Sequence, residues 1–521
     1  MGGTIFDAFN ESVTERSGKP AIICNGVRLT YRDLGGRVNR LAGALERLGI
    51  KPGDRVAILS LNCHRYLELY YGVPLMGAIV VPLNFRVPPA ELNYIIEHSG
   101  ARTLVVDAAF APMLATLRDC SPSIEHYISI ADKPADGCLS YEELLAEGEE
   151  GPRGTLPTED DLVGLFYTSG TTGEPKGVML THKNIVSNVK HSMAVYKPSP
   201  DDIYLHAAPM FHLADAAAVF SDTTCGATHA FIPRFDPKGV LETVATERVT
   251  LLLLVPTMIN FILRQPDVDQ YDLSSLKQIT YGASPIAPEL LRKAMKVFKC
   301  RFFQGYGLTE AAPLLTVLRP EDHMLDSDGN NPRLASCGKP APGVDVRVVK
   351  DDGAEVKPGE TGEIIARGAN IMAGYWKRPE DTAVAVRDGW LYTGDLATVD
   401  QDGYIYLVDR KKDMIVTGGE NVFSTEVEAA LYEHPAIKEA AVIAVPDPNW
   451  GEAVHACVAL IDGQSAEADE IIEFCRFRLA GYKIPRSVEF FAGELPKGGT
   501  GKILKKELRE AHWRGRTRRI S

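Results

Sequence analysis

The chain has 521 residues, of which 45% are hydrophobic and 24% are charged, an ordinary balance for a globular protein in water. This length exceeds the usual size of one hydrophobic core and predicts two or more domains. The formal net charge of −13 argues against nucleic acid as a partner. A homodimer is left open.

The cysteines and the apolar segments exclude further classes. The nine cysteines are scattered, and no two form a CxxC pair, so neither a zinc site nor a disulfide framework is expected. The first residues lack the basic start and apolar run of a signal peptide. The most apolar stretch, residues 251–263, is short and contains Pro256, which predicts buried core and no transmembrane segment. We therefore expect a cytoplasmic protein.

Strand-like and helix-like segments alternate along the first part of the chain. Residues 31–49 carry apolar positions at helical spacing, and residues 54–60 and 77–84 read as strands. This alternation predicts an α/β fold with a large N-terminal domain of parallel or mixed sheets flanked by helices. Residues 403–416 read as strands on both sides of a charged segment, 409–413. We place the boundary there, with domains 1–409 and 410–521, the second a small mobile α+β domain.

Residues 167–177, YTSGTTGEPKG, form the most unusual segment. A strand-like stretch runs into a loop of glycines and hydroxyl side chains that ends near Lys176. Glycines allow backbone N–H groups to face an anion, hydroxyls add donors, and the lysine adds charge, so the loop predicts phosphate binding. It is not a Walker A loop, because Lys176 is followed by Gly177 rather than by Ser or Thr.

Further motifs follow in order: PMFH (209–212), YGAS (281–284), YGLTE (306–310), YTGDL (392–396), DRKKDMIVTGGENV (409–422) and KGGTGKI (497–503). With the loop at 167–182, they resemble the adenylate-forming superfamily, which includes acyl-CoA synthetases, over essentially the whole chain. The resemblance implies a reaction in two halves. A carboxylic acid and ATP give an acyl-adenylate and pyrophosphate, and coenzyme A then displaces AMP.

The resemblance also implies roles for particular residues. Thr168 and Glu310 would bind Mg²⁺, and Lys502 would contact the carboxylate and the α-phosphate during catalysis. The expected nucleotide contacts are Thr168, Ser169, Gly170, Thr171, Thr172, Gly173, Lys176, Gly282, Ala283, Ser284, Gly305, Tyr306, Gly307, Thr309, Asp395 and Arg410. Lys412 matches the hinge about which the small domain rotates between the two halves. The expected CoA contacts are Gly418, Gly419, Glu420, Trp450, Tyr482, Lys483 and Arg486.

The acid is less well defined by the sequence. His212 resembles a residue that gates the acid pocket, although a buried histidine with a satisfied hydrogen bond explains it equally well. Asp215 would meet a polar substituent of the substrate or cap a helix. The small apolar residues after His212 favour a medium- or long-chain fatty acid, with aryl acids such as cinnamates or benzoates next. A luciferase-like oxygenase and a non-catalytic nucleotide-binding homologue are the other classes left open.

Overall fold

The computed structural model describes residues 3–131, 133–148, 151, 154, 156–168, 174–284, 286–327, 329–498 and 503–514. The chain divides into two compact units. The first unit comprises residues 1–346 and 366–391, and the second comprises residues 347–365 and 392–521. The boundary expected within residues 409–413 stays a prediction.

The first sheet of the first unit has eight strands in the described chain, in the order β19-β9-β8-β4-β3-β5-β6-β7. Its strands are β3 (Arg55–Leu59), β4 (Ile79–Pro82), β5 (Thr103–Val106), β6 (His126–Ser129), β7 (Leu139–Ser140), β8 (Leu162–Thr168), β9 (Lys176–Thr181) and β19 (Gly374–Tyr375). Strands β4, β3, β5, β6 and β7 pair in parallel, whereas β8 and β9 form an antiparallel hairpin. The loop 167–177 therefore joins the two strands of this hairpin.

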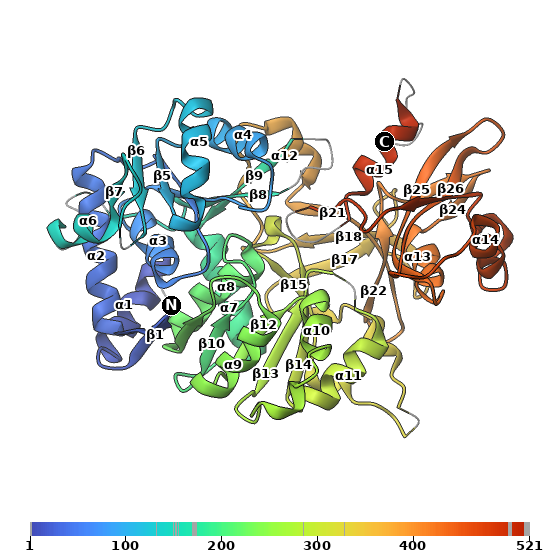
Figure 1. Ribbon diagram of the computed structural model, residues 1–521, viewed down its shortest axis with the longest axis horizontal. Coiled ribbons are helices and arrows are strands. Elements are labelled where there is room, and N and C mark those ends of the chain that lie inside the picture. The colour runs from blue at the N-terminus through green and yellow to red at the C-terminus, as the bar shows by residue number, and fades with distance from the viewer. Residues whose placement is uncertain are drawn as a thin grey trace. The chain divides into compact units, whose positions relative to one another are not determined.

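Within the described residues, the second sheet of this unit has nine strands in the order β16-β15-β14-β13-β12-β10-β11-β1-β2. Figure 1 shows β12, β13 and β14 side by side in it. They are β1 (Pro20–Cys24), β2 (Val27–Thr30), β10 (Ile203–His206), β11 (Thr228–Phe231), β12 (Leu251–Leu254), β13 (Gln278–Gly282), β14 (Arg301–Gly307), β15 (Leu314–Leu318) and β16 (Lys339–Pro340). Strands β10 to β14 are parallel, as the alternation of strands and helices predicts.

The helices of the first unit connect these strands and cover the sheets. They are α1 (Ile5–Glu15), α2 (Tyr31–Arg47), α3 (His64–Leu75), α4 (Pro89–Ser99), α5 (Leu114–Cys120), α6 (Tyr141–Glu147), α7 (His182–Tyr196), α8 (Leu213–Cys225), α9 (Pro237–Glu247), α10 (Pro256–Leu263), α11 (Pro288–Phe298) and α12 (Pro379–Ala385). The side chain of Thr30 caps α2, and that of Thr181 caps α7, each accepting a hydrogen bond from the backbone three residues on.

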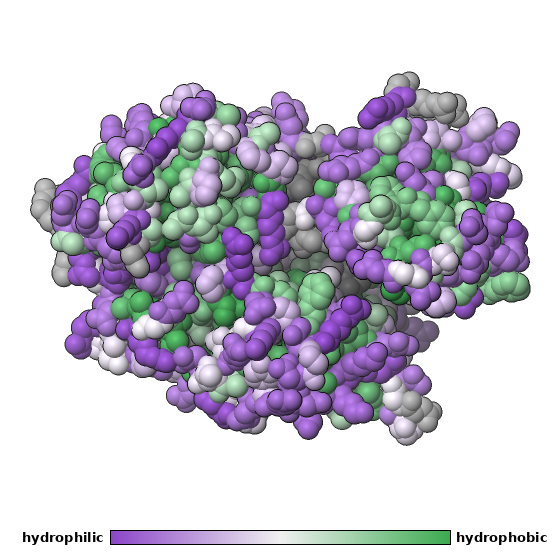
Figure 2. Space-filling view, in the orientation of Figure 1, coloured by the Kyte–Doolittle hydropathy of each residue, from purple (hydrophilic) through white to green (hydrophobic). Residues whose placement is uncertain are grey.

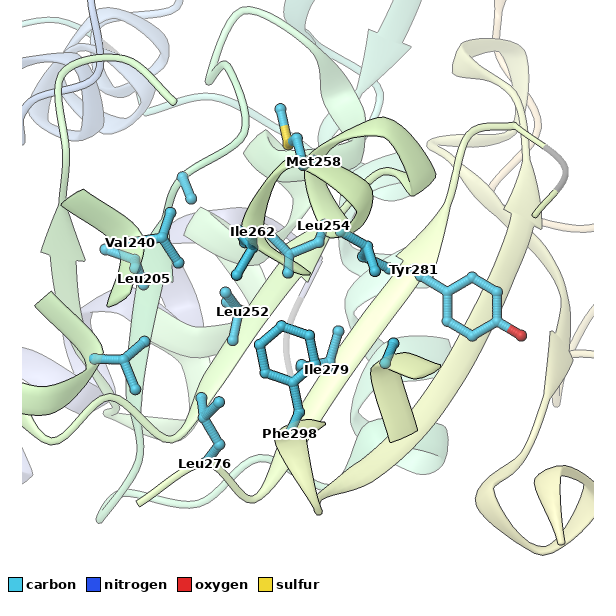
Figure 3. Close-up of a cluster of buried hydrophobic side chains, with 14 of the residues drawn as sticks. Leu205, Val240, Leu252, Leu254, Met258, Ile262, Leu276, Ile279, Tyr281 and Phe298 are labelled. Atoms are coloured by element: carbon cyan, nitrogen blue, oxygen red, sulfur yellow. The ribbon is translucent and has the colours of Figure 1, made fainter. Parts of the chain in front are cut away.

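One face of the nine-stranded sheet forms a core with α9, α10 and α11 (Figure 3). Leu252 and Leu254 of β12 and Ile279 of β13 contribute to this core, together with Met258 and Ile262 of α10. Because successive side chains of a strand point to opposite faces, residues such as Leu251, Leu253, Gln278 and Thr280 face the other side of the sheet. That second face is where the site lies.

Two smaller sheets complete the described chain. The first has the order β17-β18-β21-β20, with β22 paired to β21, and is built from β17 (Asp345–Val349), β18 (Thr361–Arg367), β20 (Val386–Arg387), β21 (Trp390–Val399) and β22 (Ile405–Arg410). The other has the order β24-β23-β26-β25, with β27 paired to β26. It comprises β23 (Ile415–Thr417), β24 (Glu420–Val422), β25 (Ile437–Asp447), β26 (Gly451–Leu460) and β27 (Ser487–Phe491).

Helices α13 (Ser424–Tyr432), α14 (Ala468–Arg476) and α15 (Lys505–Trp513) accompany the last sheet. Ile415, Val427, Val442, Val454 and Ile471 belong to one core between α13, α14 and the strands. The second unit thus has its own α+β core, as expected for a separate small domain.

The predictions for local structure are largely confirmed. The helix expected at 31–49 is α2, and the strands expected at 54–60 and 77–84 are β3 and β4. The apolar stretch 251–263 divides into β12 and α10, with Pro256 as the first residue of the helix.

Hydrophilic residues dominate the visible surface, with hydrophobic patches between them (Figure 2). Within the described residues, no helix has both the length and the apolar character needed to cross a membrane.

Candidate active site

A deep pocket lies in the first unit, between the second face of the nine-stranded sheet and helices α7 and α8. It encloses about 1030 Å³ of empty space, part of which is open to solvent. Helix α7 lines it with Asn188, Ser192 and Tyr196. Helix α8 contributes Leu213, Ala214, Ala217, Ala218, Ser221 and Asp222, and the sheet contributes Leu251, Leu253, Gln278 and Thr280. The spacing of four along α7, and of two along β13, matches one face of each element.

The pocket brings together three of the sequence motifs. PMFH contributes His212, YGAS contributes Gly282 and Ala283, and the segment at the end of β14 contributes Gly305, Tyr306, Gly307 and Thr309. Ser284 follows Ala283 directly and is exposed. Residues that are more than 70 positions apart in the sequence thus line one cavity. This convergence supports the motif-based prediction that they serve one site.

Close backbone packing explains two of the glycines in these motifs. A Cβ atom on Gly282 would lie 2.2 Å from the carbonyl oxygen of Gly305, and one on Gly307 would lie 1.8 Å from that of Pro313. Both distances are far shorter than a nonbonded contact, so no larger residue fits without moving the backbone. Ala283, directly after β13, has a φ of 63°, a conformation that non-glycine residues adopt rarely. Such strained residues cluster at functional sites.

Glu310 lies beside the pocket in a short 3₁₀ helix, Thr309–Ala311. Its side chain is buried, and its Oε1 accepts a hydrogen bond of 2.7 Å from the phenol of Tyr375. The ammonium of Lys176 lies 5.2 Å from the centre of the Tyr375 ring and forms an ion pair of 2.5 Å with Asp381. Tyr375 therefore contacts both predicted residues, Glu310 and Lys176, and Asp381 pairs with Lys176. The sequence analysis predicted neither the tyrosine nor the aspartate.

Neither missed residue has a local sequence signal. Tyr375 lies in the two-residue strand β19, which pairs with β9, and Asp381 lies in α12. The contact between Tyr375 and Glu310 spans 65 positions, so only the folded chain reveals it.

The structure describes the residues on either side of the predicted phosphate-binding loop. Thr168 ends β8 and pairs with Lys176 at the start of β9, so both flank the loop. Ser169, Gly170, Thr171, Thr172 and Gly173 lie outside the described residues. Lys502, on the second unit, also lies outside them. Their predicted roles stay predictions.

His212 and Asp215 differ in their relation to the pocket. His212 lines it and also caps α8, because its Nδ1 accepts a hydrogen bond of 3.2 Å from the backbone of Ala214. Burial lowers the pKa of His212, and Arg86 lowers it further, which favours the neutral imidazole. The two readings of His212, as a pocket residue and as a buried histidine with a hydrogen bond, are therefore compatible.

Both readings of Asp215 are wrong in the structure. It does not line the pocket, and the cap of α8 is His212. Instead, its Oδ2 lies 2.6 Å from Nδ1 of His206, and its Oδ1 accepts a hydrogen bond of 3.3 Å from Tyr204. The pair of Asp215 and His206 is fully buried. Because a buried carboxylate is costly without partners, this network satisfies Asp215 inside the protein and away from any substrate.

Comparison with known proteins identifies the family. Residues 9–376 match the model of the AMP-binding enzymes, and residues 426–502 match that of the AMP-binding enzyme C-terminal domain. The chain belongs to the adenylate-forming enzyme family. A feruloyl-CoA synthase of an Amycolatopsis species is 43% identical over 493 residues, covering 94% of this chain and 95% of the relative. A long-chain-fatty-acid–CoA ligase of Bacillus subtilis is 35% identical over 543 residues, covering 97% and 94%.

A solved structure agrees with these relatives. The o-succinylbenzoate CoA synthetase of Bacillus subtilis, in complex with its acyl-adenylate intermediate, has a TM-score of 0.83 and 30% identity, with 96% of this chain and 97% of that one covered. The adenylate-forming enzyme described here is thus an AMP-forming acid–CoA ligase that uses ATP and CoA, and Mg²⁺ is the usual metal of its family.

The residues at the expected metal site fit this ion. Mg²⁺ prefers hard oxygen ligands and keeps waters and phosphate oxygens in its shell. The carboxylate of Glu310 and the hydroxyl of Thr168 are such ligands. Moreover, the hydrogen bond from Tyr375 holds the Glu310 carboxylate in one orientation, as is usual for a group next to a metal ligand.

The second unit of the ligase carries the other predicted nucleotide contacts. Asp395 of β21 pairs with Arg410 of β22, with Nε of the arginine 3.2 Å from Oδ1 of the aspartate. Lys412 follows two residues later and is half-buried. Burial lowers its pKa, although the carboxylate of Asp413 counteracts this effect. Arg509 of α15 donates hydrogen bonds to the carbonyl of Lys412 and to Asp413, so the predicted hinge is held by side-chain contacts.

Part of the predicted CoA set is brought together on the surface of this unit. The Arg486 guanidinium lies 5.0 Å from the centre of the Trp450 ring, which is 46% exposed. The backbone of Gly418 donates a hydrogen bond of 2.9 Å to the carbonyl of Trp450. Gly419 follows in an exposed turn, and Glu420, also exposed, begins β24. Tyr482 is also exposed, but its neighbour Lys483 forms an ion pair of 2.7 Å with Glu426. We name Gly418, Trp450 and Arg486 the tryptophan cluster.

Proposed function

We propose that this ligase activates an aryl acid of the cinnamate or benzoate type. An oxygen of the acid's carboxylate bonds to the α-phosphorus of ATP, and the bond from that phosphorus to the bridging oxygen of the β-phosphate breaks, which releases pyrophosphate. The CoA sulfur then bonds to the acyl carbon, and the carbon–oxygen bond to AMP breaks. The medium- or long-chain fatty acid that the sequence favours is the second candidate.

The lining of the pocket carries the proposal. Tyr196, Tyr204 and Tyr306 line it, and Asn188, Ser192, Gln278 and Thr280 add polar groups along its walls. Asn188 already accepts a hydrogen bond from the backbone of Leu314, but the buried Oε1 of Gln278 has no hydrogen-bond partner among the described residues. An alkyl chain would leave this oxygen unpaired, at a free-energy cost of about 1–3 kcal/mol. An aromatic ring can pack against the tyrosines, and its polar substituents can pair with the polar groups. The 43% identity to a feruloyl-CoA synthase supports the same acid class.

The small side chains of α8 favour room for a ring. Ala214, Ala217 and Ala218 line one wall, where larger residues would narrow the cavity. This is the feature from which the sequence favoured a long acyl chain, and it serves a planar ring equally well. The choice between the two acids therefore depends on the polar lining, which the sequence did not reveal.

Residues of the chain would supply positive charge and orientation for the first half-reaction. Lys176 and the loop before it would hold the phosphates of ATP, Asp395 and Arg410 would contact the ribose, and Lys502 would neutralise charge between carboxylate and α-phosphate. Mg²⁺, held by Glu310 and Thr168, would neutralise phosphate charge. Gly282, Ala283 and Ser284 would pass along the adenine edge, with the Tyr306 ring against its face.

In the second half-reaction, the small domain would turn about Lys412. The tryptophan cluster would then contact the nucleotide end of CoA, with the Trp450 ring offering a stacking surface and Arg486 offering a charge for phosphate. The cytoplasmic location and the homodimer considered from the sequence stay open.

A competition experiment tests the acid class. The enzyme receives equal concentrations of 4-hydroxycinnamate, benzoate, octanoate and palmitate with ATP, Mg²⁺ and CoA, and the thioesters are quantified by mass spectrometry. The proposal expects an aryl-CoA thioester to dominate. If octanoyl-CoA or palmitoyl-CoA dominates, the proposal is wrong and the enzyme is a fatty-acid–CoA ligase.

A further inference from the structure

Helix α8 leads from the motif residues deep into the pocket. His212 precedes the helix, and the residues Ala214, Ala217, Ala218, Ser221 and Asp222 line the pocket on successive turns. At 1.5 Å per residue, the ten residues from His212 to Asp222 span about 15 Å along the helix. Asp222 therefore lies far from the carboxyl ends of β13 and β14 and from Thr309, where the adenylate would form. It faces the distal end of a bound acid.

Asp222 is an unusual residue to find in such a wall. Only 3% of its surface is exposed, and its side chain receives a single long hydrogen bond, 3.5 Å, from the hydroxyl of Ser221. Within the described residues it forms no ion pair. Burial raises the pKa of Asp222 well above its usual value, and the carboxylates of Asp202 and Asp215 raise it further. Burial therefore favours the protonated form of the carboxyl group, which both donates and accepts a hydrogen bond.

Asp215, on the same helix, has stronger hydrogen-bond partners than Asp222. Asp215, seven residues earlier and on the same side of the helix, does not line the pocket and is satisfied by His206 and Tyr204 at 2.6 and 3.3 Å. Asp222 lines the pocket and has no comparable partner among the described residues. Buried polar groups in proteins are nearly always hydrogen-bonded, so a carboxyl group that lines a cavity and has one weak bond is placed to pair with a polar group of a ligand.

We propose that Asp222, with the hydroxyl of Ser221, forms a subsite for a hydroxyl group at the end of the acid opposite its carboxylate. This inference rests on the proposed aryl-acid function and narrows it to a hydroxyaryl acid. The carboxyl group donates to the substrate oxygen and accepts from the substrate hydroxyl. Asp222 does not touch the reacting atoms, so it determines specificity and takes no part in the chemical steps.

The energetic consequence is a discrimination between acids. A site built to bind a substrate hydroxyl rejects the analogue that lacks it, because its own polar group is then left unpaired. We expect 4-hydroxycinnamate to have a kcat/KM at least about tenfold above that of cinnamate. An ether at the same position, as in 4-methoxycinnamate, accepts a hydrogen bond but donates none, and falls between the two.

Three variants test the subsite by this ratio of kcat/KM values. Asp222→Leu removes the hydrogen-bonding group at similar volume and is expected to bring the ratio to about one, mainly by lowering the value for 4-hydroxycinnamate. Asp222→Asn keeps a donor and an acceptor and should retain most of the preference. Thr224→Val is the matched control, since Thr224 lies on α8 but bonds to the carbonyl of Phe220 and does not line this pocket. Its ratio should equal that of the wild type.

The outcomes distinguish failure of the hydroxyl subsite from failure of the proposed aryl-acid function. A wild-type enzyme that forms aryl-CoA thioesters but treats cinnamate and 4-hydroxycinnamate alike overturns the subsite and leaves the aryl-acid function intact. Asp222→Leu lowering both kcat/KM values equally also overturns it, because that pattern indicates a structural role. An enzyme that forms no thioester from any aryl acid removes the proposed function itself. A wild-type enzyme without the preference overturns the subsite even if Asp222→Leu fails to fold.

Discussion

Tyr375 donates a hydrogen bond of 2.7 Å to Glu310, which lies 65 positions earlier in the sequence. The same tyrosine ring lies under the ammonium of Lys176 at 5.2 Å. One side chain thus contacts both the proposed metal ligand and the lysine at the end of the phosphate loop. The relative orientation of these two groups depends on it.

Replacement of Tyr375 by Phe should therefore impair the first half-reaction. The ring remains, but Glu310 loses the donor that orients its carboxylate. Loss of such a supporting group typically lowers metal affinity or activity by about 10- to 100-fold. We expect kcat/KM for pyrophosphate release to fall by about tenfold, and half-maximal activity to require more Mg²⁺.

Tyr271→Phe is the control for this change, since among the described residues the Tyr271 hydroxyl bonds only to nearby Asp267, at 3.5 Å. A Mg²⁺ titration of pyrophosphate release compares the two variants. An unchanged Mg²⁺ requirement in Tyr375→Phe would show that Glu310 is oriented without this bond, or that it does not hold the metal.

The two glycines at the strand ends should differ in how they tolerate alanine. In Gly307→Ala the new Cβ would lie 1.8 Å from a backbone oxygen, which cannot move without the strand. Overpacking of this kind costs about 1–3 kcal/mol or more. In Gly305→Ala the nearest atom is the hydroxyl of Tyr196 at 3.1 Å, at the end of a side chain. Thermal and urea denaturation should show a clear loss of stability for Gly307→Ala and a small one for Gly305→Ala.

Gly305→Ala should instead affect the substrate, because Gly305 lines the pocket. A rise in KM for the acid with little change in stability would fit that position. Equal destabilisation by the two alanines would contradict the backbone clash as the reason for Gly307.

Replacement of Trp450 by Ala should separate the two half-reactions. Aromatic stacking against a base contributes about 1–3 kcal/mol, so loss of the ring should raise KM for CoA by about tenfold. The first turnover of pyrophosphate release, which needs no CoA, should be unchanged.

Phe477→Ala is the matched control, because Phe477 is an aromatic residue of the same unit that is 79% exposed and lies outside the tryptophan cluster. Its KM for CoA should match the wild-type value. A first turnover slowed in Trp450→Ala would argue that the cluster serves the adenylate step.

An ion-pair network in the first unit predicts a pH-dependent stability. Burial raises the pKa of Glu142, but hydrogen bonds from Arg37 and Arg65 outweigh this and lower it to about 2. A carboxyl group with a lowered pKa stabilises the fold above its unfolded pKa and loses that contribution as the pH falls through its folded pKa. The window therefore runs from about pH 4.5 down to about pH 2.

Glu142→Gln should accordingly destabilise the protein at pH 7 and have little effect near pH 2. The side chain is 38% exposed, so solvent screening reduces the loss at pH 7 to about 1–2 kcal/mol. Urea denaturation of both proteins at several pH values checks this. A difference between variant and wild type that stays constant from pH 7 to pH 3 would contradict the linkage.

The sequence predicts the fold class well, because the alternation of strands and helices is local. The helix at 31–49 and the strands at 54–60 and 77–84 each appear within a few residues of the expected bounds. The motifs also predict which segments meet, since PMFH, YGAS and YGLTE all line one pocket.

Other features depend on contacts that no local pattern reveals. Tyr375 and Asp381 reach the site from β19 and α12, and neither belongs to a recognised motif. Asp215 attracted attention by its place next to PMFH, but its carboxyl group is paired with His206 and Tyr204, whereas Asp222, seven positions later and on the same side of α8, lines the pocket. The partners available at each position along α8 decide which carboxyl group can meet a substrate.

The central claim is that this enzyme joins an aryl acid to CoA through an adenylate. The most direct test measures pyrophosphate release with ATP, Mg²⁺ and 4-hydroxycinnamate, with and without CoA. The account predicts release that requires the acid, amounts to about one turnover without CoA, and continues with CoA while 4-hydroxycinnamoyl-CoA and AMP accumulate. Release that does not depend on the acid, or that continues unchanged without CoA, would contradict it.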